Sequence, residues 1–199
     1  SRAALETLRQ PLEEREVTVS RVEASVTYPA NFQLVAVMNP CPCGHFPDRS
    51  RCRCTDGQIT RYLQKVSGPM LDRIDICVEA SPITYGDIRS SGNNESSREI
   101  RARVKQARKI QGERFAGENI RCNGEMSGRH IRKFCWLGRE EEKFMEEIFK
   151  KLALSARMHD RILKVARTTA DLAGEEKIRL SDLCEAVSYV KSRDKFWGN

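Results

Sequence analysis

The sequence predicts a mainly helical chain in which a mixed α/β segment, residues 1–89, precedes an all-helical domain, residues 98–199. Near the start, two β-branched runs, VTVSR and ASVTYP, favour a hairpin. Residues 90–97 read SSGNNESS and lack hydrophobic periodicity, which is typical of a linker. Beyond them, apolar residues recur three and four positions apart, the spacing of amphipathic helices.

The mixed segment opens with a short helix expected over residues 3–14. Its leucines share one face, and Pro11 should disturb its end because proline has no N–H to donate. The two hairpin strands follow at Val17–Arg21 and Ala24–Pro29. Arg15 precedes the first of these strands and Arg21 ends it, so the hairpin could contact a phosphate backbone through charge, or it could be purely structural.

Two further strands are predicted on either side of a cysteine-rich loop. FQLVAVMNP, residues 32–40, fits a buried strand that ends at Asn39. RIDICVEA, residues 73–80, places its aliphatic residues on one face. A helix is expected between them, around residues 58–66, so the segment mixes both kinds of secondary structure.

The second part of the chain is expected to contain five helices, four of them with an apolar stripe that can face a core. Serines suited to N-capping precede several of them. The expected positions are residues 98–115, a short helix after Ser127, residues 140–152, residues 155–172 and a helix after Ser181.

Positive charge is concentrated in the second part of the chain. The net charge is +7, and residues 89–199 hold 25 Lys and Arg against 17 Asp and Glu, a balance of +8. A basic helix there carries Arg98, Arg101, Lys105 and Arg108, which either contact a polyanion or form an ordinary solvated face. No stretch approaches the ~18 apolar residues of a membrane span, and no signal peptide opens the chain. We therefore expect a cytoplasmic protein without a membrane partner.

Four of the eight cysteines are clustered, and the remaining four are isolated. Cys41, Cys43, Cys52 and Cys54 form the pattern C-x-C-x₈-C-x-C. Two close cysteine pairs joined by a short loop can supply a tetrahedral Zn²⁺ site, although these pairs are tighter than the usual C-x₂₋₄-C. The alternative is a turn-rich loop with free thiols. The isolated cysteines are expected to be buried as small apolar side chains.

Five segments, in this order, resemble the Mg-chelatase-like family of AAA+ ATPases and are similar to its competence-type members. The resemblance spans nearly the whole chain. The segments are LETLRQPLEER (5–15), VTVSR…YPANF (17–32), LVAVMNPCPCG (34–44), RYLQKVSGPMLDRIDI (61–76) and LSARMHDRILKVARTTADL (154–172).

The resemblance implies that residues 1–89 are the α/β remnant of a AAA+ core and that residues 98–199 form an all-α helical lid domain. It also implies a ring-forming homo-oligomer that uses ATP and Mg²⁺. A phosphate-binding loop, G-x-x-x-x-G-K-[ST], is absent from the sequence, and in this family it precedes the segment SRAALETLRQPLE. We therefore expect a C-terminal piece of a longer protein that does not bind or hydrolyse ATP by itself.

The resemblance assigns roles to individual residues. Asn39 corresponds to sensor 1, which orients the attacking water, although Asn-Pro can simply start a turn. Arg73 corresponds to an arginine finger that acts on a neighbouring subunit, although it could pair with Asp72 or Asp75 instead. Arg157 matches sensor 2, with Arg161 as second choice; otherwise both belong to a solvated basic face.

The expected function is that of a ring ATPase that remodels DNA, as a helicase or branch-migration enzyme of competence or recombination. Two alternatives stay open. One is a chelatase-type or protein-remodelling ATPase. The other is a zinc and nucleic-acid binding module without ATPase activity, which would not need Asn39, Arg73 and Arg157 together.

Overall fold

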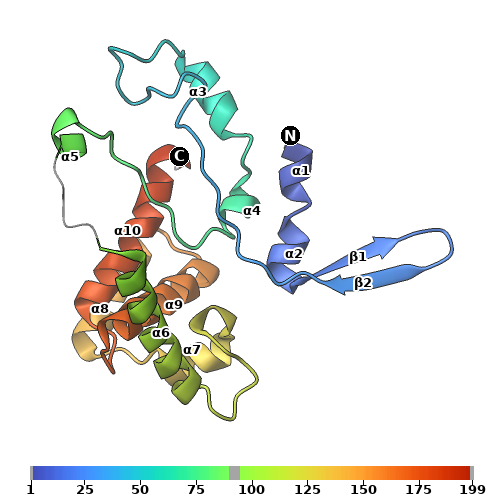
Figure 1. Cartoon of the computed structure of the whole chain (residues 1–199), viewed down its shortest axis with the longest axis vertical. Helices are drawn as coiled ribbons and strands as arrows, with labels where there is room; N and C mark the ends of the chain where they lie inside the picture. The colour runs from blue at the N-terminus through green and yellow to red at the C-terminus, as the bar shows by residue number, and fades with distance from the viewer. Residues whose placement is uncertain (1, 90–94, 198–199) are drawn as a thin grey trace. The chain divides into compact units, whose positions relative to one another are not determined.

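The computed structural model describes residues 2–89 and 95–197 (Figure 1). The chain divides into two compact units. Unit 1 comprises Ser1–Cys77 with Ser192–Asn199, and unit 2 comprises Val78–Lys191. Residues 90–94 of the predicted linker lie outside the described residues. Within the described part of the chain, no helix is both long and apolar enough to cross a membrane.

Unit 1 begins with two short helices, α1 (Arg2–Glu6) and α2 (Arg9–Glu14), where one helix was predicted. The break at Thr7 and Leu8 follows from Pro11, which has no N–H to donate to the carbonyl four residues earlier. Pro11 is instead the third residue of α2, a position whose N–H has no partner within the helix. Pro11 therefore breaks the predicted helix before its own position and does not shorten the helix at its C-terminal end.

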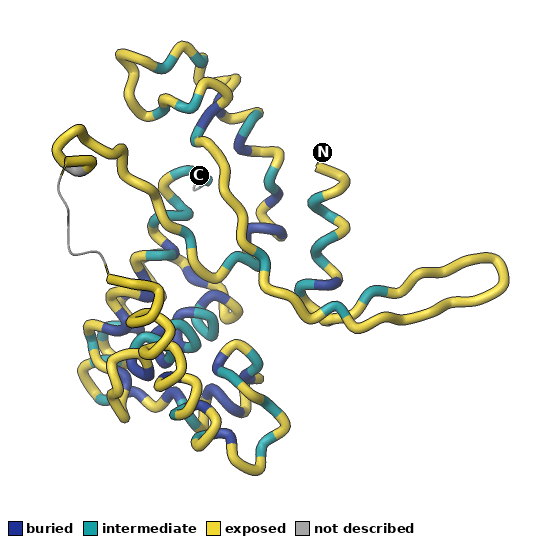
Figure 2. The backbone as a smooth tube through the Cα atoms, viewed as in Figure 1, coloured by how far each residue is buried: buried dark blue, intermediate teal, exposed yellow. Residues whose placement is uncertain are grey.

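The predicted hairpin is confirmed as β1 (Glu16–Ser20) and β2 (Ser25–Pro29), an antiparallel pair with Thr18 opposite Thr27. The two threonine hydroxyls lie 2.9 Å apart. Nearly all of its residues are exposed, so the hairpin projects from α2 with little packing of its own (Figure 2).

The strands predicted at residues 32–40 and 73–80 are wrong for this structure, because both segments are irregular. Among the described residues, the sheet consists only of β1 and β2. A buried strand needs neighbours that pair its backbone and cover its side chains. Without them, Val37 stays 96% exposed and Val78 stays 71% exposed.

The core of unit 1 is small and surrounds the cysteine loop. The predicted helix at 58–66 forms as α3 (Asp56–Leu63), which begins with a capping box of Thr55 and Gln58. Helix α4 (Gly68–Leu71) follows, with Ser67 as its cap. Cys41 is fully buried against two residues of α3, Ile59 and Leu63.

Unit 2 is helical, as expected for the second part of the chain. Its core is built mainly from α7, α8, α9 and α10; the predicted apolar stripes of α9 and α10 are buried, and that of α8 is partly buried. The elements are α5 (Tyr85–Arg89), α6 (Ser97–Arg114), the 3₁₀ turn η1 (Asn123–Glu125), α7 (Gly128–Phe134), α8 (Arg139–Lys151), α9 (Ala156–Ala173) and α10 (Leu180–Trp197), whose last residues group with unit 1.

Two expectations about burial need correction. Of the isolated cysteines, Cys135 is buried, but Cys184 is exposed because it lies on the outer side of α10, next to the buried Leu183. The stripe of α6 is also only partly covered. Ala107 and Gln111 are buried, whereas the first three turns of the helix contain no buried residue.

Candidate functional site

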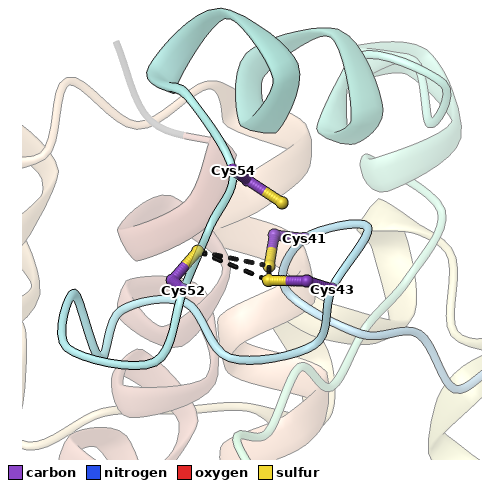
Figure 3. A group of neighbouring side chains, drawn as sticks. All are labelled: Cys41, Cys43, Cys52 and Cys54. Atoms are coloured by element: carbon purple, nitrogen blue, oxygen red, sulfur yellow. Dashed lines mark hydrogen bonds between the residues drawn. The ribbon is translucent and has the colours of Figure 1, made fainter.

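The four clustered cysteines converge on one point. The Sγ atoms of Cys41, Cys43, Cys52 and Cys54 all lie within 4.8 Å of one another (Figure 3). The Cys41–Cys43, Cys41–Cys52 and Cys43–Cys52 distances are 3.4, 3.8 and 3.6 Å. A tetrahedral Zn²⁺ with Zn–S bonds of about 2.3 Å requires sulfurs about 3.8 Å apart. The spacing therefore fits a zinc ion, and all four thiols are free.

Local turns bring the two cysteine pairs together. Gly44 adopts φ +82°, a conformation that favours glycine, and its N–H donates to the Cys41 carbonyl at 3.1 Å. The Asp48 carboxylate accepts hydrogen bonds from the Ser50 N–H and hydroxyl, at 3.0 and 2.6 Å. The N–H of Cys52 donates to the Asp48 carbonyl at 2.8 Å. These short-range hydrogen bonds thus fold the loop back, so that the second cysteine pair lies beside the first.

Backbone N–H groups also point at the sulfurs. Those of His45 and Arg53 lower the pKa of Cys43 to about 5, and that of Phe46 donates to Cys41 Sγ at 3.4 Å. Burial, together with the neighbouring sulfurs, raises the pKa of Cys54 to about 11. Four thiolates this close repel one another, so a cation at their centre is what would let all four ionise.

The cysteine cluster is reachable from solvent on one side. Cys43 is exposed and opens onto a hollow that is also lined by His45, Ser50, Arg51 and Arg53. Cys41 lies on the opposite, buried side. A metal ion or a chelator can therefore reach the sulfurs without unfolding the core.

Asn39 lies immediately before this cluster and is exposed. A Cβ atom added to Gly44 would be 3.6 Å from Asn39 Nδ2, so the cysteine loop passes beside the Asn39 amide. The loop therefore lies next to the predicted sensor-1 residue. Its contact with a nucleotide stays a prediction.

Arg73 follows α4, and its side chain is only 12% exposed. Its guanidinium donates to the Glu13 carboxylate of α2 and to the Pro69 carbonyl. Asp72, by contrast, accepts from Arg193 at 3.4 Å. Arg73 is thus held within unit 1 by a glutamate that the sequence had not indicated, and its role as a finger stays a prediction.

Arg157 and Arg161 lie on α9 in unit 2, on the side opposite the buried Ile162 and Ala166. Arg157 is exposed and Arg161 is half-buried. Lys164, one turn further along, donates to the Gly124 carbonyl at 3.4 Å. This face of α9 is therefore partly engaged with η1, and the sensor-2 role stays a prediction.

A buried polar network anchors α9, and sequence reasoning missed it. The Asp171 carboxylate accepts two hydrogen bonds from Arg114 of α6, one from Asn123 at 2.8 Å and one from Arg167 at 3.1 Å. Arg167 also donates to the carbonyls of Glu175 and Glu176. Burial lowers the pKa of Arg167, and Asp171 opposes that shift. The sequence signal for this network was the pair Arg167 and Asp171, two opposite charges one turn apart beside the apolar stripe of α9.

Two family sequence models match the chain and together cover most of it. "Magnesium chelatase, subunit ChlI" matches residues 1–88, and "Magnesium chelatase, subunit ChlI C-terminal" matches residues 94–190. The chain therefore belongs to the magnesium-chelatase family, as the sequence motifs indicated.

Similar proteins carry the same segment within longer chains. Competence protein ComM of Haemophilus influenzae is 42% identical over 189 residues, which is 94% of this chain and 36% of ComM. YifB of Escherichia coli is 42% identical over 190 residues, and YifB of Salmonella typhimurium is 40% identical over 190 residues. In both cases, the match covers 94% of this chain and 36% of the relative. The chain thus spans about a third of the length of these relatives.

Proposed function

We propose that this chain is the C-terminal part of a AAA+ ATPase that forms a homo-oligomeric ring and couples ATP and Mg²⁺ turnover to remodelling of DNA. Family membership supports ATPase-type function, and the similarity to a competence protein favours DNA as the substrate. The phosphate-binding loop would come from the rest of the longer protein.

The observation that carries this proposal is the exposure of two apolar segments beside Asn39 and Arg73. Residues 32–38 and 74–80 have strand-like sequences, yet their valines are exposed. Parallel strands of a AAA+ core are buried on both faces, so further strands of the longer protein would cover them. Completing that sheet would set Asn39 at the end of a strand, where an amide can orient water at a phosphate.

The test is Arg73→Ala in the longer protein that contains this chain. An arginine that stabilises transition-state charge on the neighbour's nucleotide is worth about 10³–10⁵ in turnover. We expect ATP binding and ring assembly to persist while turnover falls by that factor. Mixing the variant with one that lacks a working phosphate-binding loop should restore part of the activity. Some interfaces then combine an intact arginine from one subunit with an intact phosphate-binding loop from its neighbour.

The matched control is Glu13→Gln, which removes the carboxylate that holds Arg73 and leaves the arginine in place. Arg73 is 12% exposed and Glu13 is 42% exposed, so this ion pair is partly buried and its loss should lower stability in either variant. If Arg73 serves only that pair, both variants should lose a similar amount of stability and keep near-normal turnover. That result, or failure of co-assembled mixtures to recover activity, would contradict the role in trans.

We also propose that the cysteine cluster binds Zn²⁺ as a structural ion. Four sulfurs at tetrahedral spacing leave no coordination position for water, which is the pattern of a structural site rather than a catalytic one. Its place directly after Asn39 suggests that it fixes the end of that segment. ATP chemistry would not pass through it.

The same cluster is the observation that favours the second candidate, a zinc and nucleic-acid binding module without ATPase activity. Turnover by the longer protein separates the two, because the module would bind zinc and DNA but hydrolyse no ATP. A chelatase-type or protein-remodelling ATPase would hydrolyse ATP without stimulation by DNA, so DNA-stimulated turnover distinguishes it from the first proposal.

A further inference from the structure

Helix α6 holds most of the chain's excess positive charge. Its 18 residues include seven Arg and Lys and two Glu, a balance of +5 out of +7 for the whole chain. Only Ala107 and Gln111 are buried within it. The first three turns of the helix are exposed throughout and available to a partner (Figure 2).

Four of these cations form a single stripe. Arg98, Arg101, Lys105 and Arg108 are three, four and three residues apart, so they lie along one side of the helix over about 15 Å. All four are exposed. Within the described part of the chain, no hydrogen bond or ion pair joins their side chains to another residue.

The other cations of α6 have acidic partners. Arg103 pairs with Glu95 at 2.8 Å, Lys109 approaches Glu113 at 4.0 Å, and Arg114 binds Asp171. Neither glutamate of the helix, Glu99 or Glu113, lies on the stripe. An ordinary solvated helix places acidic residues one turn from basic ones, whereas here like charges face one another. Among the described residues of unit 2, no acidic side chain pairs with the stripe.

We propose that this stripe, the α6 basic stripe of Arg98, Arg101, Lys105 and Arg108, binds the phosphodiester backbone of a nucleic acid. Duplex DNA carries one charge per ~1.7 Å of its axis, counting both strands, so 15 Å of duplex carries roughly nine phosphates. That number is enough for each of the four cations to contact one phosphate. The proposal deepens the DNA-remodelling function and rests on it for the identity of the partner.

The composition of the stripe indicates how it recognises that partner. Helix α6 contains no aromatic residue, so it has no platform on which unpaired bases could stack. Gly112 continues the stripe by one turn, and a Cβ placed there would meet nothing within 4 Å. A phosphate chain can therefore approach closely. The contact is expected to be independent of base sequence and strongly dependent on salt.

The test measures binding of the complete 199-residue chain to a fluorescein-labelled 20-base-pair duplex and to one of its single strands, by anisotropy between 50 and 200 mM NaCl. The variant changes all four stripe residues to Gln, which has a similar helix propensity. The slope of log K against log salt is negative. Losing four phosphate contacts should make it shallower, by about 3.6 for the duplex and about 2.8 for the single strand.

The control variant removes the same charge from α8 of the same unit, where basic and acidic residues are interspersed. It changes Arg139, Lys143, Lys150 and Lys151 to Gln and should alter the slope by less than about 1. An equal drop in both variants would mean that only net charge matters, and an unchanged slope in the stripe variant would place the contact elsewhere. Either result overturns the proposal.

A competitor separates nucleic acid from an acidic protein surface. Polyglutamate at matched charge should displace the duplex poorly, and equally good displacement would overturn the assignment to phosphodiesters. If the stripe variant binds the duplex as tightly as the unaltered chain does, the stripe is not the binding site, but the proposed ATPase function is not affected. The ATPase function is judged separately, by the turnover of Arg73→Ala in the longer protein.

Discussion

Removing the Asp171 carboxylate should destabilise unit 2 more than any surface substitution. Asp171 is 1% exposed and is the carboxylate shared by two guanidiniums, those of Arg114 and Arg167. In Asp171→Ala, Arg114 keeps a 3.2 Å hydrogen bond to Asn123 Oδ1, and Arg167 keeps its hydrogen bonds to two backbone carbonyls. Both lose their counter-charge while remaining largely buried.

The expected cost follows from that loss. Breaking a buried ion pair by removing one partner costs about 3–5 kcal/mol, because the remaining charge is left uncompensated. The ratio of unfolded to folded protein should therefore rise by about 10²–10⁴-fold. The carbonyl bonds that Arg167 retains favour the lower end of this range.

The assay is urea unfolding followed by circular dichroism at 222 nm, which reports the helices of unit 2. The matched control is Asp160→Ala on the same helix, where the carboxylate is 45% exposed and lies 3.2 Å from His159. Surface changes of this kind usually stay within about 0.5 kcal/mol. A loss below about 1 kcal/mol for Asp171→Ala, or equal losses for both variants, would show that the network does not stabilise the fold.

Three further outcomes are expected. Elemental analysis should find about one zinc per chain, lost to chelators and bound more weakly as pH falls because protons compete for the thiolates; Cys43→Ser should abolish it and Cys184→Ser should not. A metal-free chain of unchanged fold would contradict this. The purified chain should hydrolyse no ATP because it has no phosphate-binding loop, and turnover above blank would refute that reasoning. Ser96→Ala should cost about 1 kcal/mol through loss of the α6 capping box, whereas Ser97→Ala should be near neutral in the same urea assay.

The helices were predictable because their signals are local. The N-cap at Ser127 and the stripes of α8, α9 and α10 depend on residues a few positions apart, and the structure contains them. The segments at 32–40 and 73–80 were different. Their composition indicates strands, but a strand forms only when another strand pairs with it, and that partner is absent from the described residues.

Among the candidate sites, too, contacts with a local sequence signal were predictable and contacts between distant residues were not. The spacing of Cys41, Cys43, Cys52 and Cys54 predicted a convergent set, and the structure brings the four sulfurs together. The Glu13–Arg73 pair joins residues 60 positions apart, so no local pattern could indicate it. The contacts of Asp171 with Arg114 and Asn123 are likewise non-local.

The indole of Trp197, at the end of α10, has a consequence for how the chain folds during synthesis. Its Nε1 donates to the Leu63 carbonyl at 3.1 Å, and Phe196 and Trp197 pack beside Cys41. These partners are 134 residues apart in the sequence. At a translation rate of about 5–20 residues per second, Leu63 leaves the ribosome roughly 7–27 s before Trp197 does. The cysteine turns can therefore form early on a nascent chain, but their aromatic cover arrives only after all of unit 2 has been made.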